Sequence, residues 1–452
     1  MMEEMKMKME TFPDAEIPKP LKDAQDSPIP ESGGEKEKRQ EMRFIKKETM
    51  TCAKYLRRME ELGGMPSALR PFLDTLRTVY VDLKNPLEKF HLKTVGTYCV
   101  MAPQELVYAA GAIPVKLCSG NYTAFSIGDD LYPRDACPLV KAIAGFQNMG
   151  LMPVYRDCSL MTVPVTCDCK KKIVEMLEKT HRVLPLSVPA GREDEDIDRY
   201  VEELYHFAGT LETVTGNHVT WDSLAYGMNM TGRAKYELSR FLKLKKSMPY
   251  LMWGTHILAV MNAAAYMRAD EWSLHMNRLN SELGERIKKR EKVTSRKRPR
   301  IMLTGSPVIY PNMKIPLLIE EMGGILAADE TCMGERGMSD PPVVVDESFD
   351  GILRALANQV IRPCSCPTFV NNKERVYRIR QMIKDYQIQG VIYHVLRGCL
   401  VYDYEYLLLE EELGKLGIPV IRMESDYNEE DVEQLRIRTE AFIELIRLND
   451  AA

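Results

Sequence analysis

The chain has 452 residues, 28% of them charged, and a formal net charge of −4. This length exceeds one ordinary hydrophobic core, so we expect two or three domains. The small negative charge gives no overall attraction to nucleic acid, and no apolar run reaches the roughly 18 residues that a membrane span needs. Because the first residues also lack the apolar core of a signal peptide, we expect a cytoplasmic protein that binds neither nucleic acid nor membranes.

The pattern of apolar residues changes several times along the chain. Residues 1–40 are rich in Pro, Glu, Lys and Ser, which predicts a disordered tail. Residues 41–94 predict an N-terminal helical arm that packs on the body or on a partner subunit. Residues 95–196 and 298–452 alternate short apolar runs with helical patterns, and residues 197–297 form a helical segment and linker. We therefore expect an α/β protein with two Rossmann-like domains, each built on a doubly wound parallel sheet.

The eleven cysteines are the most informative residues, and in a reducing compartment they are not expected to form disulfides. Cys167 follows the apolar run Met161–Val165 and precedes a helical pattern, so it stands where a strand ends and a helix begins. Cys137 precedes Pro138, and proline is favoured in the first helical turn, so Cys137 is expected to cap a helix. Further cysteines end predicted strands: Cys118, Cys332 and Cys399. Since parallel α/β sheets bind ligands at the carboxyl ends of their strands, these thiols predict one buried metal site.

Other interpretations of these thiols stay open at this point. Any single cysteine can be an ordinary buried thiol. The chain has no pair of Cys-x-x-Cys knuckles, so its spacing is not that of a zinc ribbon. The pairs Cys167–Cys169 and Cys364–Cys366 suit zinc or an iron–sulfur cluster equally well.

Several segments together resemble the 2-hydroxyacyl-CoA dehydratase family, also called the 2-hydroxyglutaryl-CoA dehydratase D-component family. The match is closest to its double-cubane cluster protein branch and covers roughly residues 90–452. It rests on these segments, which occur in the family's order: Gly96–Leu106, Val115–Cys118, Pro133–Lys141, Thr166–Lys172, Glu330–Gly334, Cys364–Cys366, Gly398–Glu405 and Glu424–Tyr427. The chain departs from the branch at Leu400, where the branch has His, and at Cys169, where it has Gly.

The resemblance implies iron–sulfur clusters between the two domains. Dehydratase subunits of the family hold one [4Fe–4S] cluster, and the double-cubane branch holds an [8Fe–9S] cluster. Carried over residue by residue, the ligands shared by the whole family resemble Cys137, Cys167 and Cys399, and the best matches for the others are Cys99, Cys118 and Cys332. Three further cysteines are reserves: Cys158, Cys364 and Cys366. Cys52 lies outside the resemblance and is expected to be a plain thiol.

The resemblance also implies an enzyme, a homodimer that receives electrons from a separate ATP-hydrolysing [4Fe–4S] activator. The chain has no Gly-x-x-x-x-Gly-Lys-Ser/Thr motif, which agrees with ATP being handled elsewhere. We expect an ATP-dependent, low-potential reductase of a small molecule; the alternatives are a dehydratase subunit acting on an acyl-CoA, or a scaffold without a substrate. Glu105, in the first turn of a predicted helix, is either a catalytic acid or a carboxylate that complements the helix dipole. His394 is expected in the core or beside a ligand.

Overall fold

The structure is a computed structural model that describes residues 35–451 except 151, 249, 295–296 and 339–340. The tail predicted over residues 1–40 therefore lies mostly outside the described residues. The first described helix, α2, spans Glu35–Glu61 and is followed by α3 (Arg70–Tyr80). No helix within the described ranges is long and apolar enough to cross a membrane.

The first sheet has four parallel strands in the order β2-β1-β3-β4. Its strands are β1 (Thr94–Thr97), β2 (Ile113–Lys116), β3 (Cys158–Val165) and β4 (Val183–Ser187). The helices between them are α4 (Gln104–Ala109), α5 (Tyr122–Leu131), α6 (Pro138–Met149), α7 (Pro153–Arg156) and α8 (Asp168–Leu177). Apolar side chains from both faces of this sheet are buried, as expected where helices cover a parallel sheet on both sides.

The second sheet repeats this topology, with four parallel strands in the order β6-β5-β7-β8. Its strands are β5 (Arg300–Gly305), β6 (Ile325–Glu330), β7 (Gly390–Leu396) and β8 (Val420–Ser425). The accompanying helices are α13 (Lys314–Glu321), α14 (Phe349–Ile361), α15 (Lys373–Asp385), α16 (Leu400–Gly414) and α17 (Val432–Ala451). Alternate residues of β5 face different cores: Ile301 and Leu303 lie in one and Met302 in another. In both sheets the strand order reverses beside the first strand, β1 or β5, and such switch points are where ligands bind.

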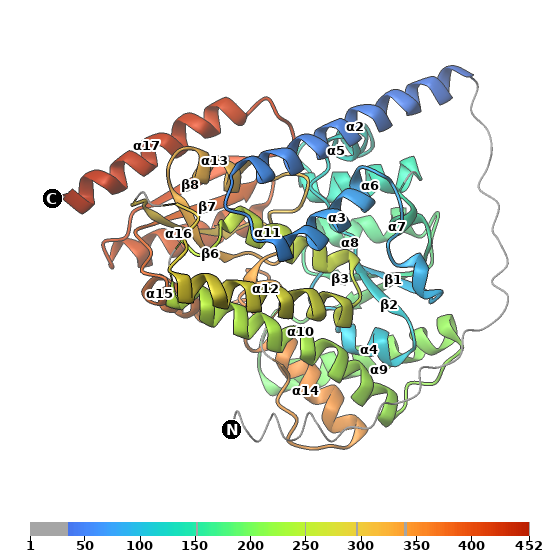
Figure 1. Ribbon diagram of the computed structural model, residues 1–452. Coiled ribbons are helices and arrows are strands. Elements are labelled where there is room, and N and C mark those ends of the chain that lie inside the picture. Colours follow the sequence, from blue (N-terminus) through green and yellow to red (C-terminus); the bar gives the residue numbers. More distant parts are fainter. Residues whose placement is uncertain (1–34, 151, 249, 295–296, 339–340, 452) are drawn as a thin grey trace.

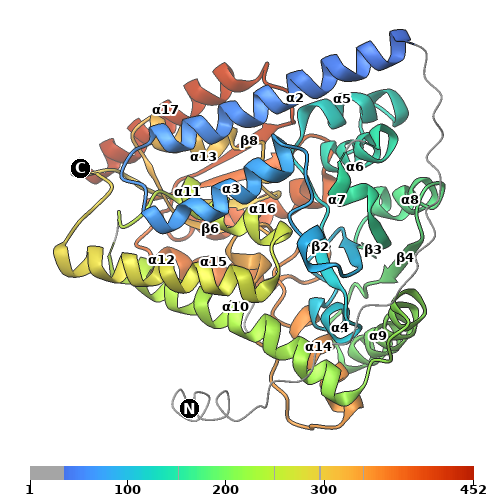
Figure 2. The ribbon, with the colours of Figure 1, turned by 45° about the vertical axis from the view of Figure 1, so that its right-hand side comes forward.

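Helices fill the chain between the two sheets: α9 (Asp194–Thr215), α10 (Trp221–Ser247), α11 (Gly254–Ala263) and α12 (Ala269–Lys289). Helices α10 and α12 lie side by side beneath the sheets (Figure 2). Helix α9 packs against α14 of the second domain, where Arg354 pairs with Asp198 at 2.7 Å.

Helix α2 connects the two domains along the top of the molecule (Figure 1). Its buried Glu48 accepts hydrogen bonds from Asn121 and from the Thr123 amide of the first domain. Further along the helix, Arg58 pairs with Glu321 of the second domain at 2.7 Å. The predicted arm thus packs on the body, and the α/β fold with two parallel-sheet domains, a helical segment and an N-terminal helical arm is confirmed.

Candidate metal centre and adjoining cavity

Cysteines follow the carboxyl ends of strands in both sheets. In the first domain Cys99, Cys118 and Cys167 each lie two residues beyond a strand, namely β1, β2 and β3. In the second domain Cys332 follows β6 and Cys399 follows β7. Because the strands of each sheet are parallel, their carboxyl ends lie along a single edge. The two sheets therefore contribute thiols from equivalent positions of the same topology.

Two of these thiols, together with that of Cys137, occupy helix N-caps, where the helix dipole favours a thiolate. Cys137 caps α6, as predicted, and Cys167 and Cys399 cap α8 and α16. The thiols of Cys137 and Cys399, from different domains, are hydrogen-bonded to each other, with Cys167 beside them. This hydrogen bond lowers the pKa of Cys399 to about 7, and the same contact together with burial raises the pKa of Cys137.

Close backbone contact holds this interdomain pair in place. Gly398 precedes Cys399 and has a φ of +74°, in the left-handed region that favours glycine. A Cβ at this position would lie 2.3 Å from the carbonyl oxygen of Asp135, two residues before Cys137. The loops that carry the two cysteines can therefore approach this closely only because residue 398 has no side chain.

A second group of thiols lies deeper. Burial is the main cause that raises the pKa of Cys118 to about 12, and the nearby sulfurs of Cys332 and Cys99 raise it further. Burial also raises the pKa of Cys332, which lies near Cys99 as well. Cys364 and Cys366, between α14 and α15, lie near Cys99 as well. Eight thiols are thus gathered from both domains: Cys99, Cys118, Cys137, Cys167, Cys332, Cys364, Cys366 and Cys399.

Three buried cations lie among these thiols. Lys116 ends β2 and is 7% exposed, Lys170 in α8 is 9% exposed, and Arg336 is 4% exposed. Burial by itself lowers the pKa of Lys170, but the sulfurs of Cys99, Cys118, Cys167 and Cys366 outweigh burial and raise it above its usual value. Buried charges require opposite charges nearby. Burial by itself favours neutral thiols, as the raised pKa of Cys118 indicates, whereas the buried cations suit a negatively charged group held by the sulfurs.

A carboxylate network fixes Arg336. Its guanidinium donates to Glu330 Oε1 at 3.1 Å and to the Ser365 carbonyl oxygen at 3.3 Å. Glu330 Oε1 also accepts a hydrogen bond from the Ser365 hydroxyl at 2.6 Å, and its other oxygen lies 3.4 Å from Arg375. Since Glu330 and Arg336 flank Cys332, and Ser365 separates Cys364 from Cys366, this network positions two cysteine-bearing loops.

The donor set fits an iron–sulfur cluster. Within the described residues, no three His, Cys, Asp or Glu side chains are arranged around one point as a single metal ion requires. A cluster, unlike a single ion, binds each thiolate through a separate iron. The soft sulfur donors and the buried cations therefore match such a cluster in chemistry and in charge.

Two of the three remaining cysteines, Cys52 and Cys158, lie apart from this group. Cys158 begins β3, so the strand separates it from Cys167 by about 25 Å, and its thiol donates to the Val154 carbonyl oxygen at 3.2 Å. Cys52 in α2 donates to Glu48 Oε1 at 3.0 Å. Cys169 lies in the first turn of α8, beside Cys167 and Tyr132. The structure thus places two of the three reserve cysteines, Cys364 and Cys366, with the predicted ligands and the third, Cys158, at the opposite edge.

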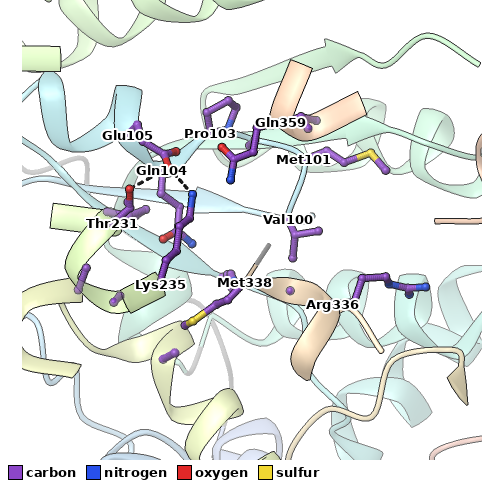
Figure 3. Close-up of a pocket in the computed structure, with 18 of the residues that line it drawn as sticks. Val100, Met101, Pro103, Gln104, Glu105, Thr231, Lys235, Arg336, Met338 and Gln359 are labelled. Atoms are coloured by element: carbon purple, nitrogen blue, oxygen red, sulfur yellow. Dashed lines mark hydrogen bonds and ion pairs between the residues drawn. The ribbon is translucent and has the colours of Figure 1, made fainter. Parts of the chain in front are cut away.

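A cavity of about 100 Å³ adjoins the thiols, and Lys116, Arg336 and Cys364 line it. Glu105 of α4 lines another wall, where it accepts hydrogen bonds from Thr231 at 2.8 Å and Lys235 at 3.0 Å (Figure 3). Burial raises the pKa of Glu105, but the Lys235 ammonium and the hydrogen bonds outweigh burial and lower it below its usual value. Glu105 is therefore an ionised carboxylate in the cavity wall, and it also lies in the first turn of α4.

His394 lies in the core at the end of β7. Its imidazole is in hydrogen-bond contact with the Ser425 hydroxyl at 2.8 Å and the Ser306 carbonyl at 3.3 Å. Burial lowers its pKa to about 4, so the ring is neutral at physiological pH. Its contacts place it beneath the loop of Cys399 rather than in the cavity.

Sequence patterns did not identify the three buried cations. Lys170 belongs to a run of three lysines, and such runs are usually solvated. A usable signal was present at Lys116, because it interrupts the apolar run Ile113–Leu117, where a charged residue needs a buried partner. Arg336 has no such local signal, since its partners come from three different segments.

Comparison with known proteins agrees with this architecture. Residues 99–446 match the family model described as 2-hydroxyglutaryl-CoA dehydratase, D-component. The chain is 30% identical to the Escherichia coli (strain K12) protein named Putative dehydratase subunit YjiM, covering 86% of this chain and all of that protein.

Two more distant relatives match over similar lengths. The beta subunit of (R)-2-hydroxyglutaryl-CoA dehydratase from Acidaminococcus fermentans is 24% identical, over 83% of this chain and 99% of its own length. A benzoyl-CoA reductase subunit from Thauera aromatica is 20% identical, over 79% and 91% respectively. These relatives are named as subunits of a dehydratase and of a reductase. The chain therefore belongs to the 2-hydroxyglutaryl-CoA dehydratase D-component family.

Proposed function

We propose that this chain is an iron–sulfur oxidoreductase that reduces a small molecule at a double-cubane [8Fe–9S] cluster. The observation that carries the proposal is the convergence of eight thiols from both domains around three buried cations. A single [4Fe–4S] cluster takes four cysteines. The surplus of thiols supports the larger cluster.

The ligands would be Cys99, Cys118, Cys137, Cys167, Cys332 and Cys399, with Cys364 and Cys366 as further donors. The cluster would supply low-potential, one-electron chemistry, whose potential depends on burial, charge and hydrogen bonds to sulfur. Lys116, Lys170 and Arg336 would offset its negative charge, and Arg336 is held in place for this by Glu330. Because these groups are buried, they also keep water from the sulfurs.

Glu105 would act in the cavity rather than as a cluster ligand. Its ion pair with Lys235 fixes both side chains at the wall, and its low pKa makes it a hydrogen-bond acceptor for a substrate. This arrangement supports a catalytic or orienting role over a simple complement to the helix dipole. The adjoining cavity also favours an enzyme over a scaffold without substrate.

A dehydratase subunit with one [4Fe–4S] cluster is the second candidate. The relatives support it, since one is named as the beta subunit of (R)-2-hydroxyglutaryl-CoA dehydratase. In that case some of the eight thiols would not bind the cluster, and the substrate would be an acyl-CoA.

For partners we propose a second copy of this chain and a separate ATP-hydrolysing [4Fe–4S] activator as electron donor. The relatives are named as enzyme subunits, which supports assembly with other chains. The chain has no phosphate-loop motif, which agrees with ATP hydrolysis on another protein.

Metal analysis tests the proposal directly. Purified without oxygen, the protein is expected to be brown and to contain more than four irons per chain together with acid-labile sulfide. A value near four would favour the dehydratase subunit instead. A colourless preparation that contains zinc would contradict both candidates.

A further inference from the structure

The cavity beside the thiols has a strongly positive lining. Among the described residues that line it, Glu105 is the one carboxylate, whereas four are cationic: Lys116, Lys235, Arg336 and Arg378. Glu105 neutralises Lys235, and Glu330 neutralises Arg336 from behind the wall. The lining therefore keeps excess positive charge after its internal ion pairs are counted.

Lys116 carries this excess charge in the buried part of the wall, whereas Arg378 is only half-buried. Only 7% of the surface of Lys116 is exposed. Within the part of the chain that the structure describes, its ammonium makes no hydrogen bond and no ion pair, although it faces the sulfurs of Cys332, Cys118 and Cys99. An ammonium has three donors, and leaving them all unmatched in a buried place is costly. Lys116 can therefore face the cluster on one side and still donate into the cavity.

The size of the cavity limits what Lys116 can bind. An apolar protein cavity of about 150 Å³ holds benzene, with six carbons, so about 100 Å³ accommodates roughly four to six non-hydrogen atoms. Apolar side chains also line the cavity, among them Val100, Met101, Met338 and Trp272, beside the amides of Gln104 and Gln359. Val100, Met101 and Met338 are seen around the space in Figure 3. The site thus combines the buried Lys116 ammonium with a short hydrocarbon surface.

We propose that the cavity binds a small carboxylate of two to four carbons, whose oxygen atoms accept hydrogen bonds from Lys116. This assignment rests on the proposed function, because it places the bound anion beside the cluster. Glu105 and Lys235 form the opposite polar wall, where they contact the substituents of the acid.

Calorimetric titration of the anaerobically purified, full-length protein tests the assignment with lactate and lactamide. The two have nearly the same shape, but only lactate is an anion. Lactate is expected to bind at least about 10-fold more tightly. Lys116→Met is expected to weaken lactate binding roughly 10- to 100-fold, the range for hydrogen bonds to a charged group, when affinity is expressed per mole of iron-containing protein. Lys116→Arg keeps the charge and should recover part of the affinity.

Lys314→Met is the matched control. Lys314 is also a buried lysine, 2% exposed, but it pairs with Asp431 at 2.5 Å and does not line the cavity. This variant is expected to bind lactate as the parent protein does.

Three results would overturn the assignment: equal affinities for lactate and lactamide, unchanged lactate affinity in Lys116→Met, or binding of lactoyl-CoA without binding of lactate. Iron analysis of the same samples distinguishes failure of the carboxylate assignment from failure of the proposed function. An iron-free protein contradicts the cluster, whereas a brown protein without preference for lactate contradicts only the carboxylate site.

Discussion

Replacing Cys137 or Cys399 with Ser is expected to remove iron, brown colour and thermal stability together. The two thiols come from different domains, cap the helices α6 and α16, and touch each other. Serine replaces a soft sulfur ligand by a hard oxygen that binds iron–sulfur clusters poorly. Because cluster binding is coupled to folding, loss of the cluster should lower the midpoint of thermal unfolding by at least about 5 °C.

Iron assay, visible absorption and thermal unfolding of the same samples measure these effects. Cys52→Ser is the first control, because its hydroxyl can still donate to Glu48 and it lies outside the thiol group. Cys158→Ser is the second, since Cys158 lies at the opposite end of β3. Unchanged iron in both Cys137→Ser and Cys399→Ser would rule out a cluster between the domains.

Substituting Cys167 and Cys169 separately tests which of these two neighbouring thiols binds iron. Cys169 lies in the first turn of α8, partly exposed, whereas Cys167 caps that helix and lies beside Cys137 and Cys399. Cys167→Ser is therefore expected to lose iron and Cys169→Ser to retain it. The reverse result would move the ligand from Cys167 to Cys169.

Glu330→Gln is expected to lower the free energy of unfolding by about 3–5 kcal/mol, the usual cost of breaking a buried ion pair. Glu330 is fully buried and accepts hydrogen bonds from Arg336, Ser365 and Thr304. A neutral amide leaves the buried charge of Arg336 without its counter-charge. The loops that carry Cys332 and Cys364 then lose their common anchor.

The pH dependence of stability gives a second measure of Glu330. Burial raises its pKa, but Arg336, Arg375 and the hydrogen bonds outweigh burial and lower the pKa to about 2. The carboxylate therefore stabilises the fold fully above the ordinary pKa of about 4.5, and this contribution is lost as the pH falls from there toward 2. Glu330→Gln should remove that part of the acid sensitivity.

Urea unfolding followed by circular dichroism, at pH 7 and at lower pH, measures both effects. Glu429→Gln is the control, because Glu429 pairs with Lys54 on the exposed surface. Its substitution is expected to change stability by less than about 1 kcal/mol. Equal stability of Glu330→Gln and the parent protein would show that Arg336 finds another counter-charge.

Local patterns predicted much of this fold. The alternation of strands and helices, the cap at Cys137 and the strand-to-helix junction at Cys167 are all set by neighbouring residues, so they could be inferred from the sequence. The strand was expected only over Met161–Val165, because Ser159 interrupts its apolar pattern, yet it begins at Cys158. That difference decides which edge of the sheet Cys158 occupies, whereas the resemblance gave Cys158 only as a reserve ligand.

Features that depend on distant partners could not be predicted. Two doubly wound sheets were expected, but the order of their strands follows from crossovers between distant segments, so it was not visible in local patterns. Arg336 acquires its role from Glu330, Ser365 and Tyr402, which approach only in the folded chain. The position of the Lys116 ammonium between thiols and cavity likewise becomes evident only once its surroundings are known.

The pairing of Cys137 with Cys399 has a consequence for biosynthesis. A growing chain exposes Cys137 and Cys167 early, but Cys399 leaves the ribosome only when most of the second domain has been made. The proposed cluster takes ligands from both domains, so the first domain alone could not hold it. Cluster insertion would therefore follow translation, and a chain truncated before residue 399 would remain an empty intermediate that quality control can recognise.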